Sequence, residues 1–147
     1  FVSYGTCDMT RAAVHLLRQF EPTLPITVVD NASPDDTVAR LRADANALAP
    51  FRLSHGINWH HGPALDAAMH ATSARRLLIL DTDTFIWRSG LAQAMTDRAE
   101  QMNAWAVGHL LHVDGDGFNV DAPNGTPYVH PHCALIDTAA YQTLARA

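Results

Sequence analysis

The sequence L-L-I-L at residues 77–80 is apolar at every position and runs directly into Asp81-Thr82-Asp83. A strand with one face in water alternates polar and apolar residues, so an unbroken apolar run predicts a central strand that is covered on both faces. Strands of this kind belong to α/β sheets, in which ligands bind beyond the carboxyl ends of the strands. This feature therefore predicts a fold class and the edge of the sheet where polar residues gather.

Around this strand the sequence repeats a short β-rich run, a turn and an amphipathic helix, which is the pattern of βαβ units. We expect an α/β fold in which a mainly parallel central sheet carries helices on both faces, as a three-layer sandwich. The expected strands occupy residues 1–4, 26–29, 51–53, 77–80, 104–110 and 134–136. The expected helices are opened by Asp8, Ser33-Pro34, Pro63, Ser89 and Thr138.

The last third of the chain gives weaker patterns. Asp114-Gly115 and Asp116-Gly117 have turn chemistry, which predicts a hairpin between residues 104–110 and 118–120. Residues 121–131 are rich in Pro, Asn and Gly, as is typical of an irregular surface loop. Since no linker or internal repeat is visible, we expect residues 1–147 to belong to one domain. The sequence begins inside an expected strand and stops at the end of an expected helix, so we expect this domain to be incomplete at both ends.

Composition narrows the class of partner. The chain has 147 residues, 48% of them hydrophobic, with a formal net charge of -5. Its ten basic residues are scattered, so no positive surface is expected for a phosphate backbone and no nucleic-acid partner is expected. No apolar run approaches the ~20 residues that cross a bilayer, and no signal peptide is visible. We expect a cytoplasmic chain without a transmembrane segment.

The carboxylates of Asp81 and Asp83 need a cation or hydrogen-bond donors to balance them. Oxygen-only ligands favour a hard divalent ion, Mn²⁺ or Mg²⁺, which keeps waters and binds substrate phosphates with its remaining positions. The alternative is that one of the two acids only caps the next turn. Because the pair follows a wholly apolar strand, we favour a site for a metal or a nucleotide, with Asp81 and Asp83 as metal ligands.

Four segments carry motifs that can be compared with a known family. They are V-S-Y-G at residues 2–5, V-V-D-N-A-S-P-D-D-T at 28–37, H-G-P-A-L-D at 61–66 and L-I-L-D-T-D-T at 78–84. In this order they resemble the family 2 glycosyltransferases of GT-A fold, whose motifs read V-S-Y-N, V-V-D-N-A-S-x-D-x-T, a glycine-containing helix start and L-x-L-D-x-D-T. The resemblance covers residues 1–108 and is most specific in the second segment. The sequence departs from it at Gly5, where the family usually has Asn.

The resemblance implies a glycosyltransferase that moves a sugar from a nucleotide-diphosphate sugar donor to a hydroxyl acceptor. It places Tyr4 against the base, Asp30 or Asn31 on the pyrimidine edge, and Asp81 on the ribose. It makes Asp83 the ligand of the metal that bridges the diphosphate.

Gly62 is expected to let the backbone approach the donor closely, and the helix opened at Pro63 offers N–H groups to an anion. The acidic general base of the family lies beyond the strand expected at residues 134–136. No residue of this sequence is assigned as catalytic.

Other functions remain open at this stage. The main alternative is a nucleotide-sugar-binding module without transferase activity, because the segment with the catalytic base is missing. A nucleotidyltransferase would need a Gly- and Lys/Arg-rich phosphate loop, and Gly5-Thr6-Cys7-Asp8 is not one. Trp59, Trp87 and Trp105 are interpreted as partly buried, with stacking on a sugar as the alternative; Trp59, in the loop before Gly62, is the leading candidate for stacking. His130 and His132 are interpreted as loop residues, with an approach to the metal as the alternative.

Overall fold

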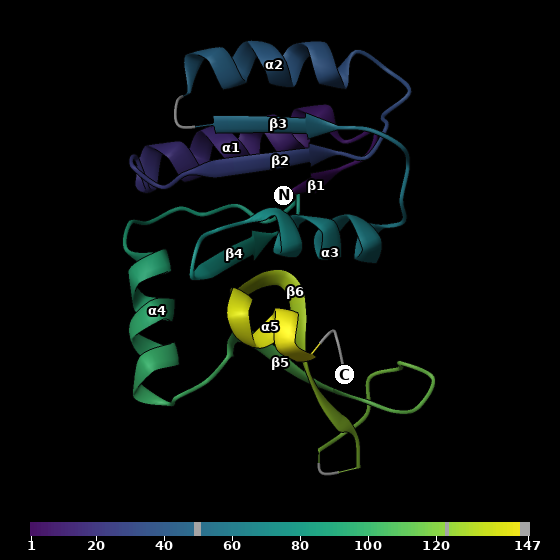
Figure 1. Cartoon of the computed structure of the whole chain (residues 1–147), viewed down its shortest axis with the longest axis vertical. Coiled ribbons are helices and arrows are strands. Elements are labelled where there is room, and N and C mark those ends of the chain that lie inside the picture. Colours follow the sequence, from purple (N-terminus) through teal and green to yellow (C-terminus); the bar gives the residue numbers. More distant parts are fainter. Residues whose placement is uncertain (49–50, 123, 145–147) are drawn as a thin grey trace. The chain divides into compact units, whose positions relative to one another are not determined.

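The computed structural model describes residues 1–48, 51–122 and 124–144. They form two compact units. The first contains residues 1–73 and 81–91, and the second contains residues 74–80 and those from 92 onward. The expected α/β class is confirmed, because both units combine strands with helices (Figure 1). Each unit is described by itself below.

The first unit is built on a parallel three-stranded sheet in the order β1-β2-β3. Its strands are β1 (Val2–Ser3), β2 (Ile26–Asp30) and β3 (Phe51–His55), and its helices are α1 (Cys7–Phe20), α2 (Thr37–Ala47) and α3 (His61–Ala71). The register pairs Ser3 with Asp30 and Asp30 with His55, so the three strands end at the same edge of the sheet. The core of the unit includes the fully buried Val14, Val28 and Leu41, one from each of α1, β2 and α2.

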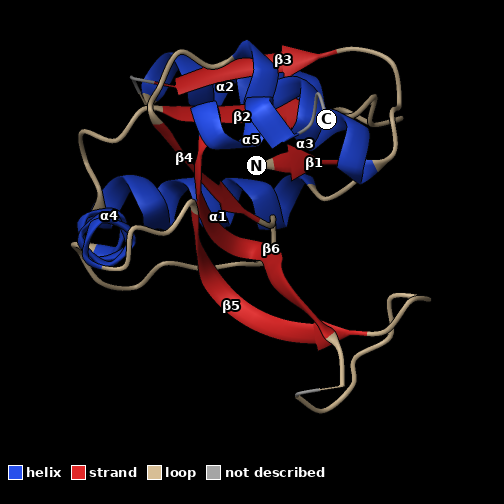
Figure 2. Cartoon of the chain, turned by 60° about the horizontal axis from the view of Figure 1, so that its bottom comes forward, coloured by secondary structure: helices blue, strands red, loops and turns tan. Residues whose placement is uncertain are grey.

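The second unit contains an antiparallel sheet in the order β4-β6-β5 (Figure 2). Its elements are β4 (Arg76–Leu80), α4 (Leu91–Gln101), β5 (Ala106–Val113), β6 (Thr126–Asp137) and α5 (Thr138–Leu144). The register of β5 against β6 shifts between Gly108 and His109. A Cβ atom on Gly108 would lie 2.7 Å from the carbonyl oxygen of Cys133, so the close approach of the two strands at this irregularity requires glycine.

The expected loop at residues 121–131 is wrong from Thr126 onward, because these residues begin the 12-residue strand β6. The expected hairpin with residues 118–120 is present but short, and it joins the end of β5 rather than residues 104–110. Val113 forms an antiparallel bridge with Asn119, the N–H of Asp114 donates to the carbonyl oxygen of Phe118 at 3.0 Å, and the N–H of Val120 donates to that of His112 at 2.9 Å. The main strand partner of β5 is β6. The turn itself is present, with the Asp114 carboxylate accepting hydrogen bonds from the N–H groups of Asp116 and Phe118.

The prolines of β6 explain why its sequence resembles a loop. Pro127 pairs only with β5, because the pairing of β6 with β4 begins at Cys133. Pro131 lies between the two paired stretches with β5, which end at His130 and resume at Ala134. Proline is tolerated in a strand at positions where no ladder hydrogen bond needs its missing N–H.

Helices α1, α2 and α3 begin at residues other than those expected. The helix expected to begin at Ser33-Pro34 begins at Thr37, whose N–H donates to the Asp35 carboxylate at 3.0 Å. Ser33 is not its cap, because its hydroxyl oxygen accepts from the N–H of Gly5 and its hydroxyl donates to Asp30. The first helix begins at Cys7, one residue before Asp8.

The helix expected from Pro63 begins at His61. Pro63 lies in the first turn of that helix, where backbone N–H groups have no partner within the helix. The longest helix of the described residues, α1, has 14 residues, and none of the described helices has the length and apolarity to cross a membrane.

Helices α1 and α2 are joined by an ion pair. Arg11 contacts Asp44 through Nε and Oδ2 at 2.6 Å and through Nη2 and Oδ1 at 3.1 Å. Asp44 is buried, and the hydrogen bond from Arg11 holds the pKa of its carboxyl below the usual value. A lowered pKa means that the charged form of the carboxyl is more stable in the folded chain than in the unfolded chain.

We expect Arg11→Ala to lower the free energy of unfolding at neutral pH, because it leaves the buried Asp44 carboxylate without its main partner. The ion pair contributes its full stabilisation at pH values above ~3.9, which is the pKa of Asp in the unfolded chain. This stabilisation is lost as the pH falls through the lower pKa of Asp44 in the folded chain. Urea unfolding at pH 7 and pH 3 tests this. The difference between the parent chain and Arg11→Ala should shrink at pH 3, and a difference that stays constant would contradict it.

Candidate functional site

The carboxyl edge of the β1-β2-β3 sheet gathers most of the residues that the sequence singles out. Tyr4 follows β1 and its side chain is exposed, whereas Asp30 and Asn31 at the end of β2 are 1% and 6% exposed. The N–H of Asn31 donates to the carbonyl oxygen of Ser3 at 2.7 Å, which joins the two strand ends. The expectation that Tyr4, Asp30 and Asn31 lie at the carboxyl ends of parallel strands is confirmed. That Asp81 and Asp83 share this edge stays a prediction, because β4 pairs with β6 in the other sheet.

The buried carboxylate of Asp30 shapes the turn after β2. It accepts hydrogen bonds from the hydroxyl of Ser33 at 2.6 Å and from the N–H of Ser33 at 3.1 Å. Ala32, inside this turn, has a φ of 63°, which is uncommon for a residue with a side chain. Each oxygen of Asp30 accepts one of these bonds and keeps capacity for another donor.

Ser33 also connects this turn to the end of β1. Its hydroxyl oxygen accepts a hydrogen bond from the N–H of Gly5 at 2.9 Å. Gly5 has a φ of 61°, a conformation that glycine adopts freely and that Asn tolerates better than most residues. The sequence did not single out Ser33 as part of the site. The signal that could have found it is a Ser three residues after an Asp at the end of a strand, where side chains often bond to the turn backbone.

The side-chain amide of Asn31 binds the loop between β3 and α3. Its Oδ1 accepts from the N–H of Trp59 at 2.8 Å, and its Nδ2 donates to the carbonyl oxygen of Trp59 and to Oδ1 of Asn58. Both N–H donors of the amide are therefore engaged within the protein. We call this set of bonds the Asn31 clamp. The clamp holds the main chain of Trp59, a tryptophan that is half exposed.

Asp81 and Asp83 have different surroundings in the loop after β4. The side chain of Asp81 is 27% exposed, and its Oδ1 is buried without a hydrogen bond. His61 Nε2 lies 3.6 Å from this oxygen and forms an ion pair with it when the imidazole is protonated. Asp83 is exposed. The loop that carries both acids belongs to the same unit as Tyr4, Asp30 and Asn31.

These two acids fit a divalent ion that takes only part of its coordination from the protein. The unbonded oxygen of Asp81 is a free ligand position, and Asp83 can reach a ligand in solvent. Within the part of the chain that the structure describes, no three His, Cys, Asp or Glu residues form a metal-binding group. Mg²⁺ and similar ions commonly use one or two carboxylates and complete their shell with water and substrate phosphates.

Gly62 lies in the first turn of α3, next to His61. A Cβ atom placed on Gly62 would meet no atom within 4 Å, so the space around this residue is open. The open space agrees with the expectation that a ligand can approach the backbone here.

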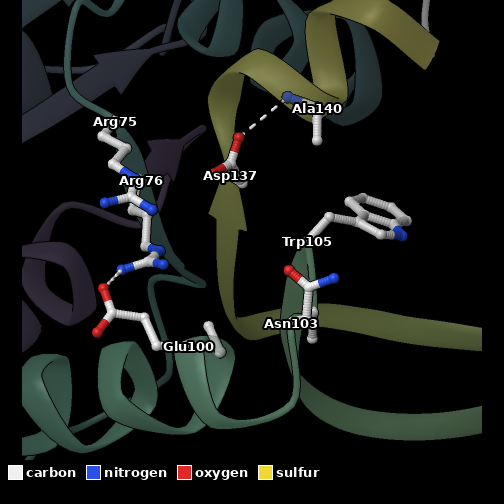
Figure 3. Close-up of a pocket in the computed structure, with 9 residues that line it drawn as sticks. Arg75, Arg76, Glu100, Asn103, Trp105, Asp137 and Ala140 are labelled. Atoms are coloured by element: carbon white, nitrogen blue, oxygen red, sulfur yellow. Dashed lines mark hydrogen bonds and ion pairs between the residues drawn. The ribbon is translucent and has the colours of Figure 1, made fainter.

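A hollow of about 370 Å³ lies in the second unit, and none of the expected site residues lines it (Figure 3). Three of its charged residues make structural contacts, with Arg76 bound to Glu100 at 3.0 Å and Asp137 accepting from the N–H of Ala140. Arg76 begins β4, whereas Asp81 follows the other end of that strand. We therefore assign the candidate site to the edge that carries Asp81, and not to this hollow.

His130 and His132 lie on β6 in the second unit rather than in a loop. Their Nδ1 atoms are 2.8 Å apart, and the ring of His132 contacts the ring of His109 edge to face. Their interpretation as loop residues is therefore wrong, because the segment that carries them is a strand.

The model of glycosyl transferase family 2 matches residues 2–127. The chain belongs to glycosyltransferase family 2. The matched residues include Tyr4, Asp30 and Asn31, which lie at the carboxyl edge of the β1-β2-β3 sheet. No match was found among curated proteins.

Solved structures of TarS from S. aureus share the fold of this family 2 glycosyltransferase chain. TarS 1–349 aligns with 98% of the chain at a TM-score of 0.70 and 14% identity, and the same segment in complex with UDP aligns over 98% at 0.70 and 16%. A further TarS structure covers 97% of the chain at a TM-score of 0.66 and 16% identity. The chain spans 47% of TarS 1–349 and 28% of the longer TarS chain.

We expect Ser33→Ala to lower the free energy of unfolding by about 1 to 2 kcal/mol, because it removes a hydrogen bond to the buried Asp30 carboxylate and the acceptor of the Gly5 N–H. Ser54→Ala on β3 is the matched control, because Ser54 is exposed and should change stability by less than about 0.5 kcal/mol. Urea unfolding of the three proteins measures the difference. Equal stability of the two variants would show that the turn does not depend on Ser33.

Proposed function

We propose that residues 1–147 are the nucleotide-sugar-binding, GT-A-like part of a metal-dependent glycosyltransferase. The enzyme moves a sugar from a nucleotide-diphosphate sugar to a hydroxyl acceptor. The observation that carries the proposal is the unbonded, buried oxygen of Asp81 in the same unit as the polar carboxyl edge of β1-β2-β3. The family membership and the presence of UDP in one TarS structure support the donor class.

The hydrogen bonds of the site favour Asp30 over Asn31 for the pyrimidine edge. The N3–H group of a uracil or thymine needs an acceptor. Each oxygen of Asp30 keeps capacity for one more donor, whereas both N–H donors of Asn31 are engaged by the loop. The exposed ring of Tyr4 offers a face to the base, and Gly62 leaves open space for the donor beside the first turn of α3.

Asp83 and Asp81 would hold Mn²⁺ or Mg²⁺, and Asp81 would also contact the ribose, as the family resemblance implies. A bound ion supplies Lewis-acid stabilisation of the charge that develops on the diphosphate leaving group. The N–H groups of His61 and Gly62 at the start of α3, together with the positive end of the helix dipole, would stabilise such an anion. The chain's own residues therefore bind and orient the donor, and no residue is proposed as the catalytic base.

We expect the chain to bind a nucleotide-diphosphate sugar in the presence of Mn²⁺, and Asp83→Ala and Asp81→Ala to weaken this binding at least about tenfold. The physical reason is the loss of a carboxylate ligand from an ion that is shared with the diphosphate. Calorimetric titration with UDP-, dTDP- and GDP-sugars measures the effect. EDTA should weaken binding by the parent chain and leave the Asp83→Ala variant nearly unchanged.

Asp97→Ala is the control, because Asp97 is an exposed acid on α4 and carries the same charge. Its affinity should equal that of the parent chain. The proposal fails if the parent chain binds none of the three donors, or if Asp83→Ala and Asp97→Ala behave alike. Donor turnover measured on the same protein separates a transferase from a module that only binds.

A further inference from the structure

Trp59 combines an exposed side chain with a firmly held backbone. Its residue exposure is 49%, yet its N–H and its carbonyl oxygen both bind the side chain of Asn31, which is only 6% exposed. About half of the residue remains in contact with solvent, so a large part of the indole is available to a ligand. The Asn31 clamp fixes the main chain of this residue and leaves the ring at the surface.

The clamp places Trp59 at one end of the candidate site. Asn31 directly follows Asp30, and its own N–H is bound to Ser3 at the end of β1, next to Tyr4. His61, two residues after Trp59, lies 3.6 Å from Asp81. The loop therefore runs from the Asp30 end of the site, where it is clamped, to the acid that would face the ribose and the metal.

We propose that Trp59 stacks on the nucleobase of the donor and that Asn31 is the positioning residue that holds it there. The inference rests on the proposed function and names one of its binding contacts. A base offers a flat π-face whatever its identity, so an indole adds affinity without choosing between bases. The choice between bases would then depend on hydrogen-bonding groups such as Asp30.

Stacking is tested by calorimetric titration of UDP and a UDP-sugar, with Mn²⁺, into the parent chain, Trp59→Ala and Trp59→Phe. We expect Trp59→Ala to weaken UDP binding by about tenfold or more and Trp59→Phe to keep most of the affinity, because a phenyl ring still stacks. Trp105→Ala is the matched control, because Trp105 has the same 49% exposure but lies in the second unit. Its affinity for UDP should equal that of the parent chain.

The outcomes separate this inference from the proposed function. If the parent chain binds neither ligand, the proposed function fails and the inference falls with it. If the parent chain binds UDP and Trp59→Ala binds it equally well, only the stacking contact is overturned. A loss seen with the UDP-sugar but not with UDP would place Trp59 on the sugar and would also overturn the inference.

The role of Asn31 is tested by a double-mutant cycle. Asn31→Ala should weaken UDP binding in the parent chain but have little further effect in the Trp59→Ala background, because it acts through the indole. A general structural defect would weaken binding in both backgrounds and would overturn the positioning role. Asn58→Ala removes only the acceptor of one Nδ2 bond and is the milder variant if Asn31→Ala does not fold. It should give a smaller loss with the same dependence on Trp59.

Discussion

Two buried polar side chains at the end of β2 must find hydrogen-bond partners inside the protein, and the local structure of the site depends on how they do so. A buried carboxylate or amide without partners costs more than the bond itself contributes to stability. Asp30 is satisfied by Ser33 and Asn31 by Trp59, which fixes the turn after β2 and the loop before α3. The same bonds determine which polar atoms remain for a ligand.

The arrangement of strands was largely predictable from the sequence. Residues 26–29 are a β-branched run and residues 77–80 are a wholly apolar run, and a parallel sheet brings the carboxyl ends of its strands to one edge. That is why the grouping of Tyr4, Asp30 and Asn31 could be expected. β6 could not be predicted, because Pro127 and Pro131 are tolerated only through the way β6 pairs with its neighbours. A single sequence shows the prolines but not the pairing.

The roles of individual side chains were less predictable than their places. Asn31 and Asp30 were equivalent candidates for one contact, and only the structure shows that the Asn31 donors are bound to a loop 28 residues away. Ser33 has good helix-capping chemistry, yet its hydroxyl donates to the carboxylate of Asp30 and accepts from the N–H of Gly5, and the helix begins at Thr37. Local propensity is a weak guide where a buried charge lies within reach.

The paired stretch of β5 with residues 126–130 of β6 extends past the end of β4, so on the β4 side these residues have no strand partner among those described. An unpaired strand edge can template association with another chain. Pro127 removes a donor from this edge, and proline is one of the residues by which natural sheets discourage such pairing. Pro127, one of the prolines that made β6 resemble a loop in the sequence, therefore also discourages edge-to-edge association of the folded chain.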